Sequence, residues 1–307
     1  MASLIPSNWD VTAKTVTLAR LIQGFLPLTG PETAAINALC RQTLALDNEQ
    51  SLYLEGDRID NSFVVLSGWI CRHHILEDGR RQITSFALPG DFLSHHNAFV
   101  AQRTHSATAH GRAVLASISD ADIAELSHRF PRLGIALSRL AAREHFLLEE
   151  QVVRIGRRNA FERVGHMLLE FFHRLNAVDK TLGLSYQMPI TQEVLVDALG
   201  LSLVHVNRTL RRLRTEGLIA MDHARHITIL DSDRLAAIAE FSPGYLLHQP
   251  LRGPKPEALA ALAAKFARIL PPSGAFAGDT DRIETFEAQA KRNAVAIIAS
   301  SRASLIH

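Results

Sequence analysis

Four arginines gather within seven residues of one segment, in the run GLSLVHVNRTLRRLRTEGLI from Gly200 to Ile219. Apolar Val206, Leu210 and Leu213 recur at i, i+4 and i+7, which is the period of one helix face. A guanidinium group offers five donors in a planar fork that matches guanine edges and phosphates. The spacing therefore predicts a helix with one apolar side and one side able to bind nucleic acid.

The side of this helix that faces away from the apolar stripe carries the candidate readers. A basic helix face is often merely solvated, so this interpretation needs support from the flanking residues. Arg208 is the best candidate for bidentate contact with guanine, and Arg211, Arg212 and Arg214 suit phosphates. The residues on or beside this face are Val204, Asn207, Arg208, Arg211, Arg212 and Thr215.

The flanking sequence predicts a winged helix-turn-helix. In PITQEVLVDALGLS, Thr191 is a helix N-cap, Gly200 permits the positive φ of a tight turn, and Ser202 caps the next helix. Two short runs at 217–221 and 226–230 then read as a hairpin, which forms the wing. We expect the first helix and Ser202 to contact phosphates, while the second helix enters the major groove.

Composition limits the classes of protein that this chain can belong to. It has 307 residues, 47% of them hydrophobic, which suggests about two domains with a large core. No apolar window long enough to span a membrane and no export signal are present, so we expect a soluble cytoplasmic protein with no membrane partner. Cys40 and Cys71 indicate a reducing compartment and are too few for a four-cysteine iron–sulfur cluster.

The chain divides into four regions. Residues 11–45 have helical spacing, and 50–120 alternate short β-rich runs with turns, including hairpin turns at Glu77-Asp78-Gly79 and Pro89-Gly90-Asp91. These predict an α+β fold with N-terminal helices and a β-sandwich or β-barrel over 1–130. A dimerisation helix at 131–158, a winged helix-turn-helix DNA-binding domain at 159–242 and a Pro-rich helical extension at 243–307 would follow.

A broken apolar stripe in the third region supports the dimer, because a single helix-turn-helix reads only a short half-site. The alternative is a helix packed only on its own barrel. Asn159 and Glu162 form a capping pair that begins the next helix. The stripe consists of Leu137, Ala141, Leu148, Val152 and Ile155.

In this order, the elements resemble the Crp/Fnr family of bacterial transcription regulators, from about Leu18 to Phe241. The matching pieces include LYLEGD, FVVLSGWI, EDGRRQITSFALPGDFL and IGRRNAFERVGHMLLEFFHRL, besides the helix-turn-helix. The resemblance implies a cyclic-nucleotide-binding-like barrel (a double-stranded β-helix). It also implies a homodimer on a palindromic operator in double-stranded DNA, contact with RNA polymerase, and an effector whose signal passes through the long helix.

Within the resemblance, Arg208 matches the family's base-reading arginine, and Gln192, Ser202 and His205 match positions that approach phosphate. Val204 stands in a part of the reading helix where relatives often carry glutamate and can touch a thymine methyl instead. The Gly-Glu and Arg-Ser pairs that bind cyclic AMP correspond here to Ser94-His95 and His105-Ser106. Without that carboxylate and fixed cation, we do not expect cyclic-nucleotide binding.

Six of the fifteen histidines fall between 73 and 110. Imidazole binds haem iron and transition metals, but no metal-ligand spacing is present, so scattered polar barrel residues are the simpler interpretation and a haem or metal role is the alternative. We expect no resident cofactor and no metal. The candidate effector pocket consists of His95, His96, His105 and Ser106.

The leading prediction is a DNA-binding transcription regulator gated by an unidentified effector. A ligand-binding signalling module that acts through protein contacts is the alternative. The sequence lacks a G-x-S-x-G elbow, a P-loop and a His-Glu-x-x-His motif, so we do not expect an enzyme. The extension contains two further helical patterns, at 257–270 and 281–306, as an appended pair of helices or a regulatory segment.

Overall fold

The structure is a computed structural model, and it describes residues 16–59, 61–93 and 102–247. All of these belong to one compact unit, residues 1–264. The two helical patterns expected at 257–270 and 281–306 lie outside the described residues. Among the helices described, none has the length and hydropathy needed to cross a bilayer.

Two short helices open the described chain, α1 (Val16–Gln23) and α2 (Gly30–Leu39). Thr29 caps α2 and forms a capping box with Glu32. The prediction that helical structure continues to residue 45 was wrong, because Thr43–Leu46 forms strand β1. β1 lies antiparallel to a distant strand, Ser106–Ile118, and this long-range pairing overrides the local helical spacing.

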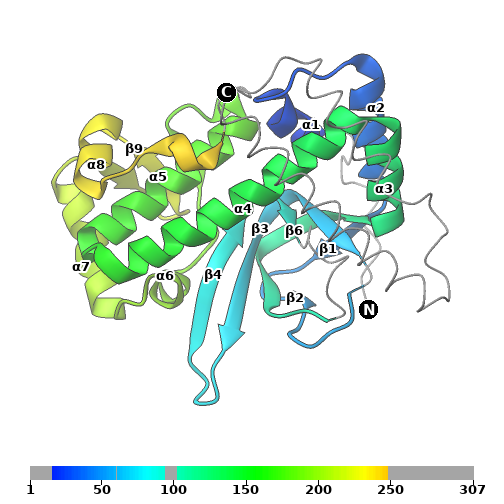
Figure 1. The fold of residues 1–307 in the computed structure, drawn as a ribbon. Helices are drawn as coiled ribbons and strands as arrows, with labels where there is room; N and C mark the ends of the chain where they lie inside the picture. The colour runs from blue at the N-terminus through cyan, green and yellow to red at the C-terminus, as the bar shows by residue number, and fades with distance from the viewer. Residues whose placement is uncertain (1–15, 60, 94–101, 248–307) are drawn as a thin grey trace, which may run out of the picture. The chain divides into compact units, whose positions relative to one another are not determined.

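The six strands that follow form one antiparallel sheet in the order β1-β6-β3-β4, with β2 on β6 and β5 on β3 (Figure 1). β1 and β4 are not paired with each other, so the predicted barrel is open in the part of the chain that the structure describes. The remaining strands are β2 (Ser51–Tyr53), β3 (Ser62–Ile75), β4 (Arg81–Ala87), β5 (Phe92–Leu93) and β6 (Ser106–Ile118).

Only one of the two predicted hairpin turns joins paired strands. The turn at Glu77-Asp78-Gly79 links β3 and β4, and Leu76 N–H donates to the Arg80 carbonyl at 2.8 Å. The second turn, Pro89-Gly90-Asp91, leads from β4 into β5, which pairs with β3 instead of β4. It is a tight turn but not a hairpin turn.

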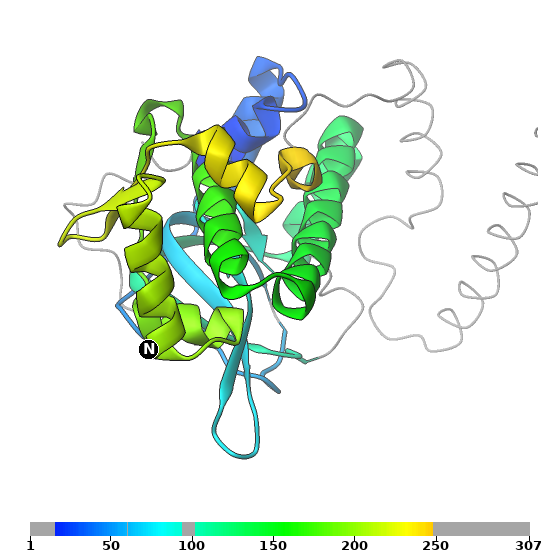
Figure 2. The same ribbon diagram turned by 90° about the vertical axis from the view of Figure 1, so that its left-hand side faces the viewer.

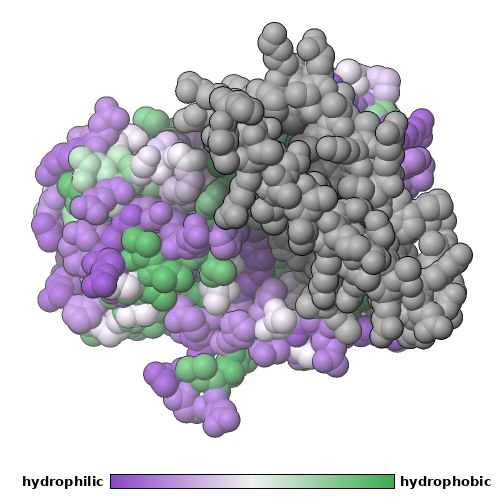
Figure 3. All heavy atoms as spheres, viewed as in Figure 1, coloured by the Kyte–Doolittle hydropathy of each residue, from purple (hydrophilic) through white to green (hydrophobic). Residues whose placement is uncertain are grey.

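Helix α3 (Asp120–Arg129) leads into the long helix α4 (Pro131–Arg157). Leu133 and Leu137, in the N-terminal half of α4, are buried. In the C-terminal half, Leu148 and Val152 are 46% and 59% exposed, so the apolar stripe changes from a packed to an open surface along the helix. Figure 3 shows apolar side chains gathered over that part of α4.

The C-terminal elements surround helix α5 (Ala160–Val178), which the predicted Asn159–Glu162 capping box begins. α4 and α5 lie side by side (Figure 2). A three-stranded sheet has the order β7-β9-β8, in which β8–β9 is the predicted wing and β7 was not predicted. These elements are β7 (Ser185–Gln187), α6 (Gln192–Leu199), α7 (Leu203–Thr215), β8 (Ile219–Met221), β9 (His226–Ile229), α8 (Ser232–Ala239) and two 3-10 turns, η2 (Lys180–Leu182) and η3 (Pro243–Leu246).

An aromatic cluster joins the large sheet to α5. The ring centroids of Trp69 and Phe171 lie 4.7 Å apart, and those of Phe86 and Phe171 lie 5.3 Å apart, both edge to face. Such pairs add about 0.5–1.5 kcal/mol each beyond the area they bury. This contact places α5, and with it the helix-turn-helix, directly against strands β3 and β4.

A side chain at Gly68 in β3 should destabilise the fold. Its φ is +78°, and a Cβ would lie 2.3 Å from the Arg112 carbonyl oxygen. Gly79 has a similar φ, +84°, but no atom lies within 4 Å of the position of a Cβ. Alanine at Gly79 therefore measures the cost of the positive φ alone, without a steric clash. We expect Gly79→Ala to cost about 1 kcal/mol and Gly68→Ala roughly 1–3 kcal/mol more, measured by urea unfolding. Equal costs would mean that β3 and β6 do not approach this closely.

Candidate nucleic-acid interface

Helices α6 and α7, which we call the reading unit, are each fixed by a side-chain cap and joined by a glycine turn. The Thr191 hydroxyl accepts from the Val194 amide at 3.4 Å, and the Ser202 hydroxyl accepts from the His205 amide at 3.3 Å. Gly200 ends α6 with φ +61° and ψ +40°, the left-handed conformation that glycine adopts without strain. All three predicted features of this helix-turn-helix are confirmed.

Helix α7 divides into a buried and an exposed face as the spacing predicts. Val206, Leu210 and Leu213 are at most 2% exposed. Arg208 and Arg211 on the other face are exposed, and neither side chain has a hydrogen bond or ion pair with another described residue. Two fixed positive charges without a partner are therefore available to an external anion.

The other predicted reading residues lie at or near the start of the two helices. Val204 is 73% exposed, and His205 and Asn207 are exposed with it on α7. The Nδ1 atom of His205 lies 3.1 Å from the Ser202 hydroxyl. Gln192 is half-buried at the first position of α6. Helix N-termini attract phosphate because their first amides have no partner within the helix.

Arg212 differs from its neighbours because it already has partners. Its Nε donates to Oε1 of Glu216 at 2.6 Å, and its guanidinium carbon lies 4.2 Å from the Phe161 ring centroid. The side chain is still 61% exposed. The carboxylate neutralises part of its charge, so Arg212 is a weaker candidate for a phosphate contact than Arg211 or Arg214.

The tip of the wing adds two basic side chains that the sequence prediction did not include. His223 and Arg225 are exposed between β8 and β9, and Arg225 has an unusual positive φ of 61°. The Arg225 Nη1 donates to the Pro189 carbonyl at 3.4 Å, which places it beside the start of α6. The sequence signal that could have identified them is their position, since both basic residues lie between the two predicted strands of the wing.

In the six-stranded sheet β1–β6, which we call the sensor sheet after the role expected of it, the two described residues of the candidate effector pocket are already hydrogen-bonded. His105 Nε2 lies 3.1 Å from the Tyr53 hydroxyl, and the Ser106 hydroxyl accepts from the Glu55 amide at 3.0 Å. Burial, with the nearby charge of Arg72, lowers the pKa of His105 to about 4. The imidazole is therefore neutral at neutral pH. His95 and His96 lie outside the described residues.

Further histidines surround Cys71 on β3. His73 is buried while His74 is half-buried, as alternation along a strand requires. The Nε2 atom of His110 lies 3.1 Å from the Cys71 sulfur, and its Nδ1 atom lies 2.9 Å from Oε1 of Glu49. Burial raises the pKa of the Cys71 thiol to about 12, so it remains protonated. Within residues 16–59, 61–93 and 102–247, no group of three or more His, Cys, Asp or Glu side chains has metal-binding geometry.

Comparisons with known proteins find two domain families in the chain. The pattern of the Crp-like helix-turn-helix domain matches residues 162–238, and that of the cyclic nucleotide-binding domain matches residues 44–130. The nitrogen fixation regulation protein FixK of Bradyrhizobium diazoefficiens is 33% identical over 190 residues, which cover 62% of this chain and 78% of the relative. FixK of Rhizobium meliloti is 30% identical over 218 residues, or 70% and 91% of the two chains.

A solved structure, that of FixK2 from Bradyrhizobium japonicum, superposes with a TM-score of 0.58 at 25% sequence identity. The match covers 66% of this chain and 98% of that chain. Sequence and fold thus match over both the sensor sheet and the reading unit. The chain belongs to the Crp/Fnr family and is a DNA-binding transcription regulator of that type.

Proposed function

We propose that this regulator acts as a homodimer that reads a two-fold symmetric operator with α7 and responds to an effector in its sensor sheet. The observation that carries the proposal is the exposed face of α7, where Arg208 and Arg211 have no partner among the described residues. An unpaired guanidinium on a capped helix suits the major groove. Contact with RNA polymerase belongs to the same proposal and rests on family membership.

The side chains of α7 and its neighbours take different roles in this proposal. Arg208 reads guanine, and Arg211 and Arg214 neutralise phosphates. Val204 touches a thymine methyl, and Asn207 flanks the base contacts. Gln192, Ser202 and His205 contact phosphates and so fix the register of the helix on the duplex. Arg212 contributes less than its position suggests, because Glu216 already pairs with it.

The exposed apolar surface of α4 supports the homodimer. Phe146, Leu148, Val152 and Val153 are 37–59% exposed within two helical turns. A contiguous apolar patch on a helix is typical of a protein–protein interface. A second copy of the same helix is the partner that would also place two reading units one helical turn of DNA apart.

The chemistry of the sensor pocket favours an effector other than a cyclic nucleotide. A phosphate needs a fixed cation, but His105 is neutral above its low pKa. Arg72, whose charge lowers the pKa of His105 more than any other charged group does, is paired with Glu144 of α4. We propose a small uncharged or weakly polar effector near Tyr53, His105 and Ser106 and no resident cofactor. A cytoplasmic location stays a prediction.

Arg208→Ala should weaken binding to a preferred duplex, selected from a random library with the parent protein, by roughly 1–3 kcal/mol and relax base choice at one position. Arg211→Ala should weaken binding to all sequences and reduce the salt slope by about one. Arg212→Ala is the matched control and should change the slope less, because of Glu216. Fluorescence anisotropy at several salt concentrations measures all three. Unchanged discrimination in Arg208→Ala would refute the assigned base contact.

Val152→Glu should weaken self-association on the order of 100-fold, because two carboxylates would meet across a two-fold axis in an apolar interface. Leu184→Glu, at a residue that is 55% exposed in the DNA-binding domain, is the control and should leave the dimer intact. Sedimentation velocity over a range of protein concentrations gives the dissociation constants. A Val152→Glu dimer as tight as the parent would exclude this face of α4 as the interface.

Stability should fall as the pH decreases from 6.5 to about 4. The pKa of His105 is lowered from 6.5 to about 4 in the folded chain. Between these pH values the imidazole is protonated in the unfolded chain but neutral in the folded chain, so protonation stabilises the unfolded state. His105→Gln should reduce the dependence of the unfolding free energy on pH there by up to about one proton. Urea unfolding at a series of pH values measures it. Above pH 7 the difference in unfolding free energy between the parent and His105→Gln should be constant, which is the internal control. If the unfolding free energies of the two proteins changed in parallel down to pH 4, the proposed neutral His105 would be contradicted.

A further inference from the structure

A continuous series of buried ion pairs and hydrogen bonds runs from the turn before β5 to the last turn of α6. Its side chains come from the sensor sheet, α4 and α5, and each is only 2–6% exposed. We call this series the buried relay. In order, its members are Asp91, Arg174, Glu170, Arg154 and Gln151, and Arg143 joins it as a second partner of Asp91.

At the sensor end, Asp91 is fixed by both backbone and side chain. Its Oδ2 accepts from the Leu88 amide at 2.7 Å, and its carbonyl accepts from the Val65 amide at 3.0 Å. Its carboxylate also pairs with Arg143 of α4 and Arg174 of α5. Burial alone would raise the pKa of Asp91, but these two guanidinium charges hold it below its ordinary value. Asp91 is therefore ionised, three residues before the segment in which part of the effector pocket is expected.

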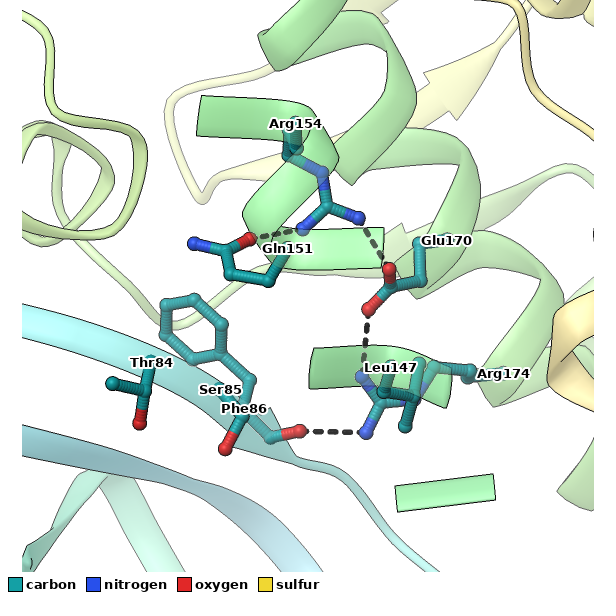
Figure 4. A pocket seen from close by; sticks show the side chains of 8 residues that line it. All are labelled: Thr84, Ser85, Phe86, Leu147, Gln151, Arg154, Glu170 and Arg174. Atoms are coloured by element: carbon teal, nitrogen blue, oxygen red, sulfur yellow. Dashed lines mark hydrogen bonds and ion pairs between the residues drawn. The ribbon is translucent and has the colours of Figure 1, made fainter. Parts of the chain in front are cut away.

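In the middle, Glu170 of α5 links two arginines on different helices (Figure 4). Arg174 Nη1 donates to Glu170 Oε1 at 2.9 Å, and its Nη2 donates to the Phe86 carbonyl of β4 at 2.6 Å. The second oxygen of Glu170 pairs with Arg154 of α4 and accepts from the Tyr245 hydroxyl at 3.0 Å. The relay thus returns from α5 to the long helix.

At the reading end, Gln151 connects the relay to α6. Its Oε1 accepts from Arg154, and its Nε2 donates to the Ala198 carbonyl at 2.6 Å. Because an arginine side chain can only donate hydrogen bonds, the carbonyl oxygen of the Gln151 amide must face Arg154. The NH2 group of the amide therefore faces α6. The Leu199 carbonyl accepts from Arg163 Nη1 at 2.9 Å. These two carbonyls belong to the last turn of α6, which has no further helical donors.

The turn at Gly200 that aims α7 begins directly after these carbonyls. We propose that Gln151 is a positioning residue for the reading unit, and that the ionic state of Asp91 acts on α6 through the buried relay. The route passes through α5 and does not require the apolar surface of α4. For its effect on operator binding, the inference rests on the proposed reading role of α7.

Hydrogen exchange of the full-length protein, followed by mass spectrometry, tests the relay without DNA. Gln151→Glu keeps an acceptor for Arg154 but replaces the donor to Ala198 with a carboxylate oxygen. Peptides that cover 192–203 should exchange about fivefold faster or more, the size expected of a coupling between sites. Asp91→Asn, which does not contact α6, should accelerate the same peptides. Peptides of the wing, 219–229, should change less than twofold in both variants.

Leu147→Met is the matched control, because Leu147 is buried beside the relay on α4 but has no polar partner in it. It should leave 192–203 unchanged. If Asp91→Asn does not fold, Glu170→Gln removes a central charge with the same side-chain shape. Unchanged exchange at 192–203, or equal acceleration there and in the wing, would overturn the proposal, since the second result is a general loss of stability.

Binding to the selected duplex then connects the relay to function. Gln151→Glu should lower affinity for that duplex about tenfold, with a smaller loss for an unselected duplex at the same salt. Combined with Asp91→Asn, the losses should be less than multiplicative, as for residues in one network. Multiplicative losses would overturn the coupling. Faster exchange in α6 with unchanged DNA affinity would overturn the positioning role of Gln151, whereas a failure of the reading role of α7 would appear separately as unchanged discrimination in Arg208→Ala.

Discussion

Charges that are buried where the sensor sheet, α4 and α5 meet constrain the rest of the molecule. Moving an unpaired charge out of water costs several kcal/mol, so each buried arginine there requires an acidic partner at a fixed place. Asp91 and Glu170 each bridge two arginines, and those arginines come from different helices. Sliding α5 along α4 by one turn would separate these pairs, so they define a single register for the reading unit.

The stabilising energy of this junction comes mainly from apolar contacts. A buried ion-pair network often contributes little more than well-packed hydrophobic side chains would, although removal of one partner costs about 3–5 kcal/mol. The edge-to-face contacts of Phe171 with Trp69 and Phe86 bury large surfaces beside the network. The aromatic cluster therefore holds the sheet and α5 together, while the charged side chains determine the geometry in which they are held.

Much of the reading unit could be predicted from the sequence, because its signals are local. Thr191, Gly200 and Ser202 fix the caps and turn within a few residues, and the apolar period of α7 needs no knowledge of the rest of the chain. Strand β1 and the open edge of the sheet could not be predicted, because both depend on which distant strand supplies hydrogen bonds. The buried relay was missed for the same reason, since Asp91 and Arg174 are 83 residues apart.

Arginine has opposite roles in the two halves of the regulator, and its surroundings decide which. Arg154 and Arg208 both lie on helices, Arg154 on α4 and Arg208 on α7. α5 packs over Arg154, which must then be neutralised by Glu170, whereas nothing described covers Arg208. Arg212 is intermediate, because Glu216 one turn away neutralises part of its charge in the open. The placement of carboxylates, more than that of arginines, therefore separates the cations that hold the structure from those left for DNA.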